Sequence, residues 1–75
     1  MKIKYKYIEF VKRETAKEIF WNINNHKYEQ YLGNLQYNPK WKQWEFCPEP
    51  DTGFTQDCLE YIIHFIKQLI GEEAH

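Results

Sequence analysis

Aromatic and lysine side chains alternate around residue 41, and this cluster is the part of the sequence best suited to binding a ligand. Trp41 stands between Lys40 and Lys42, with Tyr37 and Trp44 close by. Aromatic rings can stack on single-stranded bases while ammonium groups contact the phosphates. The same rings could instead fill the core, because a domain this small needs their apolar area to fold. Trp41 is expected to be exposed, since it falls at a turn and out of phase with Trp44.

A second basic group lies at the start of the chain, where Lys2, Lys4 and Lys6 alternate with apolar residues. These lysines could follow a phosphate backbone. They could equally form the solvated face of an edge strand, which lysines protect from pairing with other chains. The candidate binding surface comprises Lys2, Lys4, Lys6, Tyr37, Lys40, Trp41 and Lys42.

The sequence contains no motif for catalysis, for a metal or for a cofactor. Cys47 and Cys58 lack the paired spacing of a zinc site, and the chain has no serine to act as a nucleophile. Its glycines form no phosphate-binding loop. Glu60 and His64 are expected as an exposed helix pair rather than as an acid and a base. We predict a protein that is not an enzyme and that holds neither a cofactor nor a metal.

Length and charge narrow the class of protein further. The 75 residues make one domain with a net charge of −1, divided between +4 over residues 1–17 and −4 over residues 51–75. Domains that bind duplex nucleic acid are usually basic overall, which disfavours that function. No apolar stretch is long enough to cross a bilayer, and two cysteines are too few for a disulfide framework. We therefore expect a cytoplasmic protein with reduced thiols and no membrane partner.

Alternating apolar residues predict four strands, at residues 2–10, 19–23, 31–37 and 44–48. The alternation changes phase between Tyr7 and Ile8, which is typical of a β-bulge. Polar residues at 12–18 and 24–27 indicate turns, and so does the Asn-Pro-Lys run at residues 38–40. Gly33 inside the third strand indicates a bulge, or a place where a large aromatic side chain lies across the backbone.

A helix is predicted to begin after Thr55, whose hydroxyl suits an N-cap, and to end at Gly71. Its apolar residues repeat at steps of three and four, and Cys58 is expected to be buried among them. The predicted fold is α+β: a four-stranded antiparallel β-meander followed by one C-terminal helix packed on one face of the sheet, ββββα. It occupies residues 1–71, and residues 72–75 are expected to be a flexible tail.

Residues 32–69 resemble a family of small, uncharacterised proteins from phage and prophage genomes. The family pattern runs Leu-Gly-x-Ile-x-Trp, Trp-Arg-x-Tyr-x-Phe-x-Pro, Thr-x-Phe and Cys-Leu-x-x-Ile-x-x-Phe-Ile-x-x-Leu. The corresponding positions here are Leu32, Gly33, Leu35, Tyr37, Trp41, Lys42, Trp44, Phe46, Pro48, Thr52, Phe54, Cys58, Leu59, Ile62, Phe65, Ile66 and Leu69. The chain departs from the pattern at Leu35, Tyr37, Lys42 and Trp44. The resemblance implies a shared fold and a phage or prophage origin, and it carries no activity.

These observations favour a small interaction protein that binds a host or phage protein or associates with itself, for example as a homodimer. Exposed tryptophan and tyrosine side chains on a compact scaffold are effective interface anchors. The alternative is binding of single-stranded or structured nucleic acid through the aromatic and lysine residues of the sheet.

Overall fold

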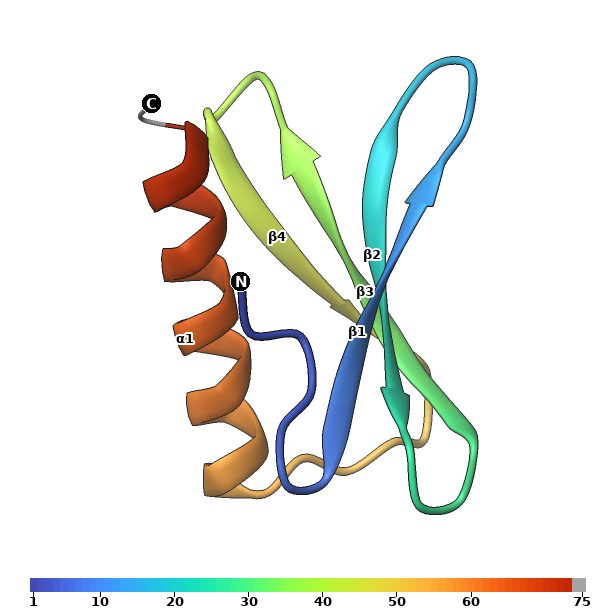
Figure 1. Ribbon diagram of the computed structural model, residues 1–75. Helices are drawn as coiled ribbons and strands as arrows, with labels where there is room; N and C mark the ends of the chain where they lie inside the picture. Colours follow the sequence, from blue (N-terminus) through green and yellow to red (C-terminus); the bar gives the residue numbers. More distant parts are fainter. Residues whose placement is uncertain (74–75) are drawn as a thin grey trace.

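Four antiparallel strands and one helix make up the fold of the described residues. The structure is a computed structural model that describes the backbone of residues 1–73 and the side chains of residues 1–72. The elements are β1 (Ile8–Glu14), β2 (Ile19–Asn25), β3 (Gln30–Asn38), β4 (Gln43–Pro48) and α1 (Gln56–Glu73). The strands pair in the order β1-β2-β3-β4, so the sheet is an open meander, and α1 lies along one face of it (Figure 1). The predicted α+β class and ββββα order are confirmed.

The core lies between α1 and the sheet. Phe10 of β1 pairs with Ile23 of β2, so both side chains point to the helix side, and both are fully buried. Leu35 of β3 is also fully buried on this side. The helix contributes Phe65, whose ring stacks on Phe10 with centroids 3.9 Å apart. A single helix therefore seals the centre of the sheet, as expected for a layer with one apolar face.

The prediction of a strand over residues 2–7 is wrong. The chain reverses there: the N–H of Tyr5 donates to the carbonyl of Ile8 at 2.8 Å, and the N–H of Phe10 donates to the carbonyl of Ile3 at 2.8 Å. Among residues 1–73, the one β-bridge of this segment joins Lys4 to Glu9. The change of apolar phase thus marks a turn back on β1, not a β-bulge. The reversal places Tyr5 in the core, beside α1.

The predicted bulge beside Gly33 is confirmed, whereas the atoms nearest to Gly33 belong to the backbone of β4 and not to an aromatic ring. The register between β2 and β3 shifts after Ile23, which pairs with Gly33. The backbone of Gly33 has φ +146°, in a region that favours glycine. A Cβ atom here would overlap the carbonyl oxygen of Cys47 and lie 2.9 Å from Cα of Pro48. Close packing of the β3 and β4 backbones therefore requires glycine at this position.

The two ends of α1 differ in how well they were predicted. Thr55 caps the N-terminus as expected, because its hydroxyl oxygen accepts the N–H of Cys58 at 3.3 Å. The expected stop at Gly71 is wrong: the helix continues to Glu73, and Gly71 does not take the left-handed conformation of a helix cap. Residue 72, which was expected to begin a flexible tail, is helical. Residues 74–75 lie outside the described part of the chain.

The two hairpins of the sheet separate at the end nearest the helix C-terminus (Figure 1). Pairing of β2 with β3 stops at Phe20 and Gln36, whereas β1 pairs with β2 as far as Ile19 and β3 pairs with β4 as far as Asn38. The tips of both hairpins consequently project beyond the shared part of the sheet. An opening remains between the two tips, lined by residues of both hairpins and of α1.

Candidate functional site

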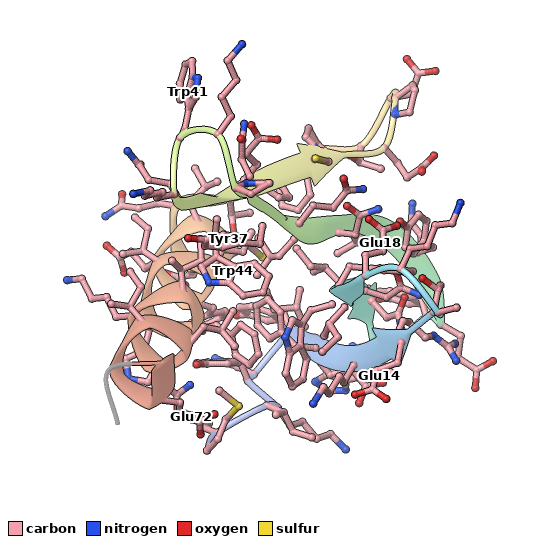
Figure 2. The ribbon with its side chains drawn as sticks, turned by 90° about the horizontal axis from the view of Figure 1, so that it is seen from above. Glu14, Glu18, Tyr37, Trp41, Trp44 and Glu72 are labelled. Atoms are coloured by element: carbon pink, nitrogen blue, oxygen red, sulfur yellow. The ribbon has the colours of Figure 1, made fainter. Side chains whose placement is uncertain are left out.

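The tip of the β3–β4 hairpin holds Trp41 out in solvent. The carboxamide oxygen of Asn38 accepts the N–H groups of Lys40 at 3.0 Å and Trp41 at 3.1 Å, which fixes the turn. Lys42 completes it with a left-handed backbone, φ +58°. Trp41 is 70% exposed, as expected from its position, and the lysines on either side of it are exposed too. Figure 2 shows Trp41 pointing away from the rest of the molecule.

Tyr37 and Trp44 lie at the base of the same hairpin, on the side of the sheet that faces α1. They are cross-strand partners, and their rings meet edge to face with centroids 5.5 Å apart. Trp44 is half-buried against the core, whereas 41% of Tyr37 remains exposed. The indole N–H of Trp44 is shielded from solvent and has no hydrogen-bond acceptor among the described residues. These two rings therefore serve partly as core and partly as surface.

A groove of about 820 Å³ lies between the separated hairpins and the last turns of α1. Figure 2 looks into this end of the molecule, with Tyr37 and Trp44 at the centre, Glu14 and Glu18 towards the β1–β2 hairpin, and Glu72 towards the helix. Its lining is mostly apolar and aromatic. The full set of lining residues is Lys12, Thr15, Ala16, Lys17, Glu18, Ile19, Trp21, Tyr37, Pro39, Trp44, Leu69 and Glu72.

The charges around this groove are of both signs. Lys12 forms an ion pair with Glu14, with Nζ 3.5 Å from the carboxylate oxygen. Lys17 and Glu18 stand at the β1–β2 hairpin, and Glu72 stands at the C-terminal end of α1. The last turn of α1 carries no basic residue to offset the partial negative charge of the helix terminus. The groove is therefore apolar in its floor and mixed in its rim, without the positive field that a polyanion needs.

Lys2, Lys4 and Lys6 lie on a different part of the molecule from the hairpin tip. All three are exposed on the N-terminal segment, which runs between α1 and β1 (Figure 1). The ammonium group of Lys2 lies over the ring of Tyr5 at 4.6 Å, and that of Lys6 lies over the ring of Tyr7 at 5.2 Å. The predicted surface residues thus belong to two separate elements.

The N-terminal segment is fastened to α1 by polar contacts that the sequence did not reveal. The side-chain N–H of Gln68 donates to the hydroxyl of Tyr5 at 3.0 Å, so the hydroxyl proton is free to donate to Nδ1 of His64 at 2.6 Å. Burial raises the pKa of Tyr5, and the Gln68 hydrogen bond offsets part of that effect. His64 therefore contacts Tyr5, whereas Glu60, its expected helix neighbour, accepts a hydrogen bond from Gln56 at 3.2 Å.

His26 holds the same segment from the sheet side. Its Nε2 lies 2.9 Å from the carbonyl oxygen of Tyr5 and 3.1 Å from that of Lys6, so a single N–H is shared between the two acceptors. The sequence did not indicate this role of His26, because residues 2–7 were expected to form a strand whose carbonyl groups would pair with another strand. Both histidines therefore hold the N-terminal segment in place, His64 from α1 and His26 from the sheet.

The cysteines form no bond with each other. Both are free thiols and half-buried, so Cys58 is less buried than expected, although it packs against the core. Burial, and to a smaller extent the charge of Glu45, raises the pKa of Cys47. A raised pKa lowers the fraction of reactive thiolate at neutral pH. Within residues 1–73, no group of three histidine, cysteine, aspartate or glutamate side chains gathers to hold a metal.

Comparison with known proteins identifies no relative. No family model matches this chain, and neither does any curated protein or solved structure. The resemblance to small phage proteins therefore stays a prediction. Among the described residues, no helix is both long enough and apolar enough to cross a membrane.

Proposed function

We propose that this protein is a small non-enzymatic interaction protein that binds a segment of another protein in the groove between its hairpins. The observation that carries the proposal is the groove itself, about 820 Å³ in volume with a floor of apolar and aromatic side chains. Ile19 and Tyr37 at its surface remain 47% and 41% exposed. Recessed apolar surface with a polar rim is characteristic of interaction sites.

The groove suits a large apolar side chain carried on a peptide backbone. Trp21, Tyr37 and Trp44 offer ring faces and edges to such a side chain. Thr15, together with the charged residues of the rim, offers hydrogen-bonding groups to the backbone on either side of it. Two lysines and two glutamates line the groove, so they attract neither a polyanion nor a polycation strongly.

Binding of single-stranded or structured nucleic acid is the second candidate, and one observation favours it. Trp41 is exposed between two exposed lysines, which is an arrangement able to stack on a base and contact its phosphate. Lys2, Lys4 and Lys6 do not extend this tip, because they lie on the N-terminal segment beside α1. A phosphate backbone would therefore meet only a short basic surface at the hairpin tip.

A phage or prophage origin belongs to the proposal as well, with the protein binding a host or phage protein in the cytoplasm. It is supported by the resemblance of residues 32–69 alone. The identities of the neighbouring genes would test it, since phage genes lie in clusters of recognisable structural and replication functions.

Selection from a displayed library of random peptides tests the groove. We expect the wild-type protein to retain peptides that share a large apolar residue, and Ile19→Glu to lose them because the charge lies in the apolar groove. Tyr28→Glu is the matched control, since Tyr28 is 70% exposed and does not line the groove. The proposal fails if no retained peptide depends on Ile19 while the variant stays folded by circular dichroism.

A further inference from the structure

Helix α1 leaves one row of aliphatic side chains open to solvent. Leu59, Ile63 and Ile70 are 43%, 53% and 54% exposed, and the partly buried Ile66 continues the row. The four positions are separated by steps of four, three and four residues. That spacing is the seam along which two α-helices pack together. We refer to these residues as the open row of α1.

The rest of the apolar helix surface is already covered. The face towards the sheet is buried, and the N-terminal segment covers one flank, where Tyr61 stacks on Tyr5 with ring centroids 5.1 Å apart. His64 and Gln68 make their hydrogen bonds to the segment on that same flank. At about 100° per residue, the open row falls on the opposite flank of α1, away from the flank that residues 1–7 cover.

We propose that the open row of α1 binds a second copy of this chain, with the two helices antiparallel about a two-fold axis. In that arrangement Leu59 lies opposite Ile70 of the second copy, and Ile63 lies opposite Ile66 of the second copy. A two-fold interface requires a surface that is complementary to itself. The open row meets this requirement, because it is aliphatic throughout and symmetrical about its midpoint.

The charges beside the row specify the antiparallel direction. Glu60 and Lys67 each follow a residue of the row by one position, so both lie along its solvent border, near opposite ends. Antiparallel packing brings Glu60 of each copy close to Lys67 of the other, forming two symmetrical ion pairs. Parallel packing would keep Glu60 and Lys67 at different heights along the two helices, so neither ion pair would form. Neither residue forms an ion pair within the described side chains, where the recorded pair is Lys12–Glu14.

This dimer goes beyond the proposed function and is independent of it, because no residue of the open row lines the groove. The row runs from Leu59 to Ile70, which is about 16 Å of helix. A helix contact of that length buries less surface area than the interface of a permanent dimer. We therefore expect an equilibrium between monomer and dimer that shifts with protein concentration.

Sedimentation equilibrium of the purified chain tests the interface. The wild type should approach twice its mass of 9.3 kDa as its concentration rises. Ile63→Glu should remain at 9.3 kDa while circular dichroism shows a folded protein, because an unpaired charge would lie in the seam. Tyr28→Glu, an equally drastic change at an exposed site elsewhere, should dimerise like the wild type. A wild type that stays monomeric at millimolar concentration, or a dimer that survives Ile63→Glu, would overturn the proposal.

Charge reversal tests the antiparallel direction separately. Glu60→Lys alone and Lys67→Glu alone should each weaken dimerisation about tenfold, since each turns two attractive pairs into repulsive ones. The double variant exchanges the charges and should return to wild-type dimerisation. A double variant that dimerises as weakly as either single variant would refute the antiparallel pairing.

Discussion

Two adjacent isoleucines of α1 offer a direct test of which helix face forms the core. Ile62 is 3% exposed and packs against the sheet, whereas Ile63 is 53% exposed. Truncating a buried isoleucine to alanine costs about 2–5 kcal/mol through lost burial and the cavity left behind. At about 0.05–0.15 kcal/mol per residue, a domain of this size has about 4–11 kcal/mol in total. Ile62→Ala should therefore remove a large part of the stability, and Ile63→Ala should change it by less than about 0.5 kcal/mol.

Urea denaturation of both variants measures this difference. Helicity followed by circular dichroism and tryptophan fluorescence should give coincident transitions, because Trp21 packs edge to face against Phe65 in the core. The measurement is made at low protein concentration, so that dimerisation through Ile63 does not contribute. Thermal unfolding of the same two variants gives a second measure, in which Ile62→Ala should lower the thermal midpoint by at least about 8 °C relative to Ile63→Ala. Equal midpoints, or a larger loss for Ile63→Ala, would show that the helix packs on a different face.

Three further outcomes are expected. Mixed-sequence single-stranded DNA and RNA should bind no more tightly than about 10⁻⁴ M at physiological salt, as measured by tryptophan fluorescence. Salt-sensitive micromolar binding that disappears in Trp41→Ala would instead favour the nucleic-acid function. Gly33→Ala should lower the free energy of unfolding, measured by urea denaturation, by more than about 1 kcal/mol, because its Cβ overlaps the Cys47 carbonyl oxygen. An unchanged free energy of unfolding would refute that packing. Because burial raises the pKa of Tyr5, the Tyr5 hydroxyl loses its proton at a lower pH in the unfolded chain than in the folded one. The stability that neutral Tyr5 contributes is therefore fully present below pH 10.0, and it is lost as the pH rises through the higher pKa of the folded state. Tyr5→Phe should flatten that part of the stability curve, and an unaltered slope would exclude Tyr5 as its source.

Most of the fold could be predicted because the spacing of apolar residues along the chain matches the strands and the helix that bury them. The alternation points Ile23 of β2 and Leu35 of β3 inward, and both are fully buried, whereas Leu32 is buried out of phase beside the register shift. The steps of three and four in α1 include the core residues Ile62 and Phe65, but they also include Ile63, which is exposed. Alternation alone does not reveal whether a segment joins a strand or folds back beside one. Residues 2–7 alternate perfectly, yet the contacts of Tyr5 with His64 and Gln68 direct the chain towards α1. Those partners lie about sixty residues away, so no local pattern contains the information.

The candidate site was predictable only in part, for a related reason. Exposure of Trp41 follows from its position in the Asn38 turn, which is local. The groove depends on where β2 and β3 stop pairing, and that point is set by the divergence of two hairpins. Ile19 and Tyr37 occupy inward positions of their strands, and their alternation therefore indicates core. They remain exposed because the divergence carries them beyond the surface that α1 covers.

Because this domain is small, its aromatic side chains form both the core and part of the exposed surface. One helix covers the centre of the sheet, where Phe10 and Phe65 are fully buried, and it leaves the separated ends of both hairpins uncovered. Trp21 and Trp44 at the border are half-buried, so each contributes to stability with one part of its ring system and to the groove with another. Removing either ring should therefore weaken folding and binding together. Ile19→Glu and Ile63→Glu are better tests of binding, because both side chains lie outside the buried core and their replacement should leave the fold intact. Each belongs to only one of the two proposed surfaces, Ile19 to the groove and Ile63 to the open row of α1.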